Sequence, residues 1–145
     1  MAGVAKDMKR WLGDGGMAIL AALGVRFDDY GIEDDDHAGW ATAIWEPSAL
    51  ACNPHGTVQA GVHAVVLDAS MNFAVNAGLH GHDRTKATIE LKTETMRPAS
   101  AGEVLAVRGA VVRETRQIAF AEARVENAGG KLVSRATGTF LLHRE

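Results

Sequence analysis

The sequence has few cysteines and prolines and no strong excess of charge of one sign. Its 145 residues include a single cysteine, Cys52, so neither an internal disulfide nor a multi-cysteine metal site is possible. The formal net charge of −3 argues against a generally basic nucleic-acid-binding protein. No Pro/Ser linker, internal repeat or targeting segment is evident, and we expect a cytoplasmic protein.

No long uninterrupted apolar run is present either. The longest mostly apolar stretch, residues 58–79, is interrupted by several polar residues, Asp68 among them. A membrane-spanning helix needs about 20 apolar residues with few or no charges, so we expect no membrane association. Hydrophobic residues make up 47% of the chain and charged residues 23%, as in ordinary globular proteins. We therefore expect one domain over residues 1–145.

The hydrophobic pattern predicts one long helix and five or six antiparallel strands. Apolar residues in 59–79 recur at three- and four-residue spacing on most sides, which is typical of a helix buried on most sides. Short connections favour antiparallel neighbours over parallel crossovers. Two short helices, 4–12 and 16–23, should form an N-terminal helical extension over 1–23. The expected strands are 25–34, 39–46, 88–97, 103–114, 118–127 and 131–143.

Asp68 is the ionisable residue in the least favourable surroundings. It follows Val66 and Leu67 within the predicted buried helix. A carboxylate in an apolar setting is costly and usually has a raised pKa or a dedicated partner. Such groups gather at functional sites, although a solvent-facing, subunit-contact or capping role is equally open from the pattern alone.

The segment before this helix, residues 53–57, is rich in turn-forming residues. It leads into Gln59-Ala60-Gly61, where the helix should begin. The first N–H groups of a helix have no intrahelical partner and can hold an anion or polarise a carbonyl oxygen. The alternative is that Thr57 is only a helix cap and Gly56 only a turn glycine.

Residues 53–62 read Asn-Pro-His-Gly-Thr-Val-Gln-Ala-Gly-Val, and residues 67–71 read Leu-Asp-Ala-Ser-Met. This combination resembles the hotdog-fold acyl-CoA thioesterases, in particular the phenylacetate-pathway and 4-hydroxybenzoyl-CoA thioesterase branch. Their usual form is N-P-x-G-T-V-H-G-G, followed by a helix with L-x-D-x-x-M. Residues 96–99, Met-Arg-Pro-Ala, resemble their L-R-P-A. The resemblance covers roughly residue 24 to the C-terminus and implies an α+β hotdog fold, an antiparallel sheet wrapped around one long central helix.

The resemblance also implies catalytic roles. Asp68 matches the carboxylate that acts as a general base on water or as a nucleophile on the thioester. Asn53 matches a residue that contacts the thioester or orients the water, and Asn72, one turn after Asp68, can also hold the water. Ala60 stands where the family has glycine and keeps the N–H that polarises the carbonyl. Gln59 replaces a histidine and can form hydrogen bonds but cannot titrate.

Further residues are candidates for substrate binding. Gly61 permits close approach of the substrate, and His55 lies in the neighbouring loop. Coenzyme A carries phosphates, which arginine binds well, so Arg97, Arg113 and Arg116 are candidate contacts. The alternative for each arginine is a solvated strand end. Coenzyme A is then part of the substrate, and no separate cofactor is expected.

Other residues with chemical potential are interpreted as structural. His63 lacks the partner spacing of a metal-binding helix, and we interpret it as a core or dimer-contact histidine. Residues 80–83, His-Gly-His-Asp, are expected to form a solvated loop rather than a metal site. Cys52 lies beside the site loop, but no Cys–His motif supports it as a nucleophile. We therefore expect no metal site.

Three functional hypotheses follow. The leading one is a thioesterase that hydrolyses an aryl or medium-chain acyl-CoA. The second is a hotdog protein that binds acyl-CoA or another ligand without turnover, for which the substitution at Gln59 is the best support. The third, a related dehydratase, is disfavoured because those enzymes rely on a catalytic histidine. The resemblance further implies a homodimer or homotetramer whose site forms between subunits.

Overall fold

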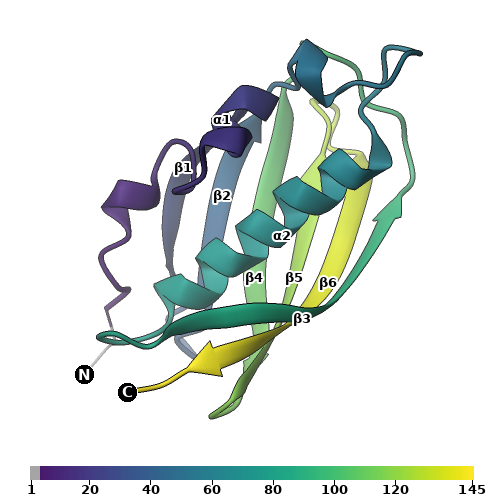
Figure 1. Cartoon of the computed structure of the whole chain (residues 1–145). Helices are drawn as coiled ribbons and strands as arrows, with labels where there is room; N and C mark the ends of the chain where they lie inside the picture. The colour runs from purple at the N-terminus through teal and green to yellow at the C-terminus, as the bar shows by residue number, and fades with distance from the viewer. Residues whose placement is uncertain (1–3) are drawn as a thin grey trace.

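The long helix α2 (Ala60–Ala77) lies across one face of a six-stranded antiparallel sheet in the computed structural model, which describes residues 4–145 (Figure 1). The strand order is β1-β2-β4-β5-β6-β3, so β3 forms one edge of the sheet. The sheet curls so that β3 passes alongside the helix (Figure 1). The strands are β1 (Val25–Ile32), β2 (Gly39–Trp45), β3 (Arg84–Thr95), β4 (Leu105–Glu114), β5 (Ile118–Glu126) and β6 (Leu132–His143). The predicted hotdog fold is confirmed.

Glycines allow the helix to approach the sheet closely. A Cβ atom at Gly39 of β2 would lie 1.9 Å from the carbonyl oxygen of Ala74, and one at Gly109 of β4 would lie 2.4 Å from that of Ser70. Both contacts involve helix backbone, which cannot move aside as a flexible side chain can. The two glycines therefore set the depth at which α2 lies, and with it the positions of the polar residues along the helix.

The core lies between α2 and the inner face of the sheet. Alternate residues of β2 point inward, so that Ala41, Ala43 and Trp45 are buried. Most of the helix is buried as well, as the pattern of apolar residues on several sides predicts. Within residues 4–145, no helix is long and apolar enough to cross a membrane.

The N-terminal segment differs from the prediction. The expected helix over 4–12 is wrong: the chain there forms only a single 3₁₀ turn, η1 (Lys9–Trp11). Its backbone pairs elsewhere, with Lys6 N donating to Ala77 O at 3.0 Å and Met8 N to the Tyr30 hydroxyl at 3.0 Å. The segment thus lies against the C-terminal end of α2 and the sheet rather than coiling on itself.

Two smaller boundaries also shift. The second predicted helix is shorter, with α1 spanning Ala18–Leu23, and it ends at Gly24 in the left-handed conformation. Strand β3 begins at Arg84, four residues before the predicted start, because its first residues continue the pairing with β6. A second 3₁₀ turn, η2 (Ala49–Ala51), precedes the loop that leads into α2.

Candidate active site

The loop before α2 is held in shape by Asn53. Its Oδ1 accepts hydrogen bonds from the backbone N–H of His55 (2.9 Å) and of Thr57 (3.2 Å), and its Nδ2 donates to the Thr57 hydroxyl (3.0 Å). Gly56, with φ of 85°, completes the tight turn. The structure therefore gives Asn53 a structural task, and its predicted contact with thioester or water remains a prediction. His55 is exposed at the tip of this loop.

The start of α2 presents free backbone donors. Gln59 takes the N-cap position without capping the helix through its side chain, and α2 has no acidic residue in its first turn. The N–H groups of Ala60 and Gly61 have no hydrogen-bond partner among the described residues. All three residues are exposed. The helix start can therefore receive a carbonyl oxygen or an anion from outside the chain.

Asp68 lies eight residues further along, where the helix passes β3. Its Oδ1 accepts a hydrogen bond from the Thr88 hydroxyl at 2.9 Å, and Oδ2 has no partner within residues 4–145. The side chain is half-buried, and burial raises its pKa, an effect that the Thr88 hydrogen bond partly offsets. A carboxylate with a raised pKa and one free oxygen is well suited to accept a proton from water.

Asn72 continues this polar strip one turn later. Its Oδ1 accepts a hydrogen bond from the Thr85 hydroxyl at 2.6 Å. Asn76 ties the same threonine to the helix, donating to it through Nδ2 at 2.9 Å. The Nδ2 of Asn72 remains without a partner in the described part of the chain, and so keeps the capacity to hold a water molecule. Thr85 and Thr88 were not found by sequence reasoning, since only the fold brings β3 beside the helix.

A hollow of about 280 Å³ opens beside the helix start. Ala60, His63 and Arg97 are among the residues that line it. Arg97 also anchors itself by donating to the Leu132 carbonyl oxygen at 2.7 Å. The structure thus brings Arg97 to the predicted site, whereas it places His63 in the core, only 2% exposed.

The other two candidate arginines lie elsewhere. Arg113 lines a surface hollow with Gly78 and His80, at the C-terminal end of α2, and Arg116 lines another with Arg144. An 18-residue helix is roughly 27 Å long, so neither arginine belongs to the hollow beside Ala60 of the same chain. Their contact with coenzyme A phosphates remains a prediction.

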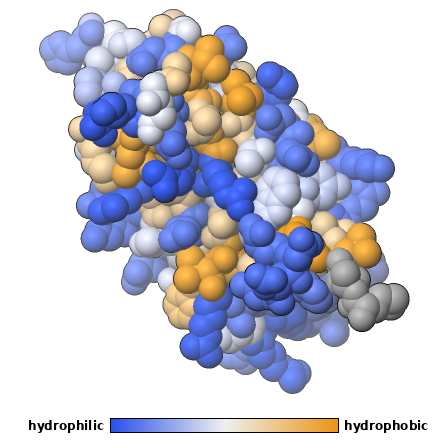
Figure 2. All heavy atoms as spheres, turned by 180° about the vertical axis from the view of Figure 1, so that it is seen from behind, coloured by the Kyte–Doolittle hydropathy of each residue, from blue (hydrophilic) through white to orange (hydrophobic). Residues whose placement is uncertain are grey.

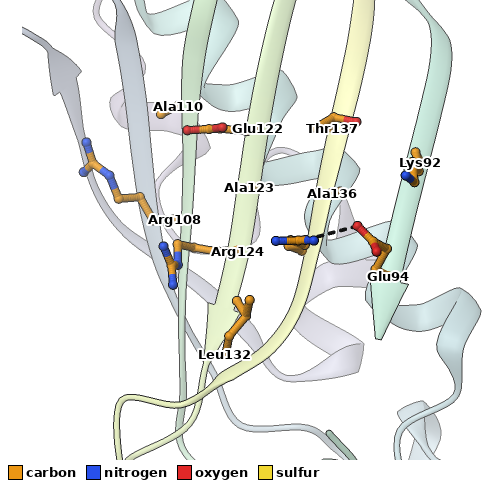
Figure 3. A pocket seen from close by; sticks show the side chains of 11 residues that line it. Lys92, Glu94, Arg108, Ala110, Glu122, Ala123, Arg124, Leu132, Ala136 and Thr137 are labelled. Atoms are coloured by element: carbon orange, nitrogen blue, oxygen red, sulfur yellow. Dashed lines mark hydrogen bonds and ion pairs between the residues drawn. The ribbon is translucent and has the colours of Figure 1, made fainter. Parts of the chain in front are cut away.

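A larger hollow lies on the opposite face of the sheet, away from α2 (Figure 3). It measures about 470 Å³, and Arg108, Arg124 and Arg135 cross it side by side on β4, β5 and β6. Each arginine already pairs with a glutamate at 3.0 Å, so the row is largely neutralised. Figure 2 shows this outer face, on which hydrophilic side chains predominate between scattered apolar patches. The hollow is separated by the sheet from Asp68 and the helix start.

The length of the helix separates the predicted carbonyl-polarising N–H of Ala60 from the predicted catalytic carboxylate of Asp68. Ala60 and Asp68 are eight residues apart, which corresponds to about 12 Å along the axis. A single thioester group cannot reach both within one chain. No cluster of metal-binding side chains occurs among residues 4–145.

Comparison with known proteins identifies the family. The model of the thioesterase superfamily matches residues 55–134, which is more than half of the chain. No protein with a curated description matches the chain by sequence. The chain belongs to the thioesterase superfamily and is a thioester hydrolase, as the sequence predicted.

Solved structures with the same fold include members of the predicted branch. A phenylacetic acid degradation-related protein from Ralstonia eutropha JMP134 is 25% identical with a TM-score of 0.75, covering 92% of this chain and 97% of that one. The E. coli PaaI protein from the phenylacetic acid degradation operon is 21% identical with a TM-score of 0.70, covering 90% and 86%. A hypothetical thioesterase from Streptococcus pneumoniae TIGR4, solved with coenzyme A, is 17% identical with a TM-score of 0.69, covering 83% and 87%.

Proposed function

We propose that the protein hydrolyses the thioester of an aryl- or medium-chain acyl-CoA, with Asp68 as the catalytic carboxylate. The observation that carries this proposal is the half-buried Asp68, held at one oxygen by Thr88 and free at the other. The likeness to the phenylacetic acid degradation-related protein, and the coenzyme A bound by the S. pneumoniae protein, support this substrate class.

The mechanism uses one water molecule and no separate cofactor. Asp68 takes a proton from the water, whose oxygen adds to the thioester carbonyl carbon. The resulting oxyanion is stabilised by the free N–H groups of Ala60 and Gly61 at the helix start. Collapse of this intermediate breaks the C–S bond, and the proton held by Asp68 passes to the leaving thiolate sulfur, which releases the carboxylic acid and coenzyme A and regenerates the carboxylate. Asn72, through its free Nδ2, holds the attacking water near Asp68.

A homodimer or homotetramer would complete this arrangement. Because Ala60 and Asp68 are too far apart in one chain, we place Asp68 of one subunit opposite the helix start of the other. The edge strand β3 supports such pairing, since it runs beside Asp68 and ends the sheet. Ile89 and Leu91 on this strand are 55% and 38% exposed, and a second copy would cover them. We also retain the expectation of a cytoplasmic protein, for which the lone cysteine is the support.

Turnover measured on a panel of acyl-CoAs tests the proposal. Phenylacetyl-CoA, benzoyl-CoA, hexanoyl-CoA and octanoyl-CoA are offered in parallel with acetyl-CoA as the short-chain control, and release of the free thiol is followed with a chromogenic reagent. We expect hydrolysis of at least one aryl or medium-chain member and little of acetyl-CoA. Tight binding of all members without thiol release would identify the protein as the binding protein considered above.

A further inference from the structure

His63 makes a buried contact that the proposed mechanism does not use. The residue lies one turn into α2 and is only 2% exposed. Its Nδ1 is 2.8 Å from the hydroxyl oxygen of Ser134 on β6, and Trp45 packs edge-on against the ring with the centroids 5.2 Å apart. The imidazole is therefore fixed in orientation by two neighbours.

The partner of Nδ1 determines which ring nitrogen carries the proton. Ser134 is fully buried, and its hydroxyl has no acceptor other than His63 Nδ1 among the described residues. A buried hydroxyl that donates nowhere is costly, so the satisfied arrangement has the Ser134 O–H donating to Nδ1. Burial also lowers the pKa of His63, which favours the neutral ring. A neutral ring that accepts at Nδ1 carries its proton on Nε2.

Nε2 is the polar atom of the ring left without a partner in the described structure. No fully buried side-chain nitrogen or oxygen among these residues lacks a hydrogen bond. Because Nε2 lacks one, this atom is not fully buried and keeps some accessible surface. His63 lines the hollow of about 280 Å³ beside the helix start, together with Ala60. Because His63 lines the hollow and Nε2 is the ring's unpartnered nitrogen, this hollow is where the N–H can meet a ligand, close to the free backbone N–H groups of the helix.

We propose that the Nε2–H of His63 is a further hydrogen-bond donor to the carbonyl oxygen of the bound thioester. This inference rests on the proposed function and assigns the substrate's carbonyl group to the hollow beside Ala60. The Ser134 hydroxyl acts through the ring as a positioning group, since it fixes the protonated nitrogen. A donor already oriented before the reaction stabilises the developing oxyanion without reorganisation.

Two amide substitutions at His63 distinguish the role of Nε2 from that of Nδ1. His63→Gln places an N–H donor near the position of Nε2, whereas His63→Asn reaches only the position of Nδ1 and can still bond Ser134. Loss of one donor to an oxyanion typically lowers kcat by about 10²–10³-fold. We expect the kcat of His63→Asn to fall on this scale, with KM changed less than threefold. The kcat of His63→Gln should be at least tenfold higher than that of His63→Asn. Thermal unfolding of each variant identifies effects of misfolding.

The protonated nitrogen is measured independently of turnover. A ¹⁵N–¹H correlation spectrum of the imidazole groups in the wild-type protein, with His63→Gln used for assignment, reports which nitrogen carries the proton. We expect the Nε2–H form, converted in part to the Nδ1–H form by Ser134→Ala. An Nδ1–H form in the wild type overturns the inference whatever the turnover of the variants.

The outcomes distinguish the two proposals. If the wild type hydrolyses acyl-CoA and both folded amide variants keep its kcat, the inference about His63 is overturned while the proposed function stands. If the wild type hydrolyses none of the panel, the proposed function fails and the role of His63 fails with it. A selective loss in His63→Asn, together with the Nε2–H form, supports both.

Discussion

The Thr88 hydroxyl on the edge strand β3 donates a 2.9 Å hydrogen bond to the Asp68 carboxylate in the middle of α2. Along the chain, the second half of α2 and the loop to β3 lie between the two residues. They meet only because the sheet curls and brings β3 beside the helix. The bond fixes one oxygen of the carboxylate and stabilises its charge, while burial acts in the opposite direction and dominates, so the pKa of Asp68 stays raised.

Thr88→Val tests this relationship. The substitution removes the hydroxyl, so the pKa of Asp68 should rise further and the acidic limb of kcat/KM should move to higher pH. We expect a loss of turnover near neutral pH of about tenfold, because a charge-assisted hydrogen bond contributes roughly 1.5–3 kcal/mol. The pH–rate profile of the variant is the measurement. Thr93→Val on the same strand is the matched control, and an equal shift in both variants would contradict the assignment.

Gly61→Ala separates folding from function at the helix start. A Cβ atom at Gly61 would meet nothing within 4 Å in the chain, so the fold does not need glycine there. Alanine should stabilise the first turn by about 0.5–1 kcal/mol. If the substrate approaches this backbone, kcat/KM should fall while the melting temperature rises. Unchanged kcat/KM would show that the substrate does not contact Gly61.

Gly109→Ala should have the opposite effect on stability. Its Cβ atom would lie 2.4 Å from the backbone oxygen of Ser70, and the helix would have to move outward. Overpacking of this kind costs about 1–3 kcal/mol. Denaturant unfolding should show a lower midpoint than for the wild type, in contrast to Gly61→Ala. A midpoint equal to that of the wild type would mean that α2 does not pack as closely as described.

Gln59→His tests the substitution at the helix cap. The Gln59 side chain is exposed and makes no hydrogen bond with the described residues, so the fold should tolerate histidine. We expect unchanged stability and turnover equal to or above that of the wild type, measured on the same acyl-CoA panel. Activity that appears only in the variant would identify the natural protein as a binding protein.

The sequence predicted those parts of the molecule that depend on local pattern. The apolar periodicity around Asp68 located the buried helix, and the run from Asn53 to Gly61 located its start. The partners Thr88 and Ser134 were not predictable, because they lie 20 and 71 residues from Asp68 and His63 respectively. The helix predicted over residues 4–12 does not form, because backbone hydrogen bonds to distant elements outweigh the local preference for helix.

The pH dependence of stability follows from the same carboxylate. Because the folded-state pKa of Asp68 is raised, its contribution to stability is fully present below the unfolded-state pKa. This contribution is lost as the pH rises through the folded-state pKa. At neutral pH the wild type therefore carries a destabilising charge. Asp68→Asn should keep or raise the melting temperature at pH 7 relative to the wild type, and this difference should shrink in acid, where the wild-type carboxyl is also neutral.

The most direct test of the account is the turnover of Asp68→Asn on the best acyl-CoA substrate of the wild type. The substitution keeps the size of the side chain and removes its charge and basicity. A general base typically contributes 10²–10⁴-fold, which is about 3–5 kcal/mol of barrier. We predict a fall in kcat on this scale, with the acyl-CoA still bound and the fold intact. Turnover within threefold of the wild type in a folded variant would contradict the catalytic role of Asp68.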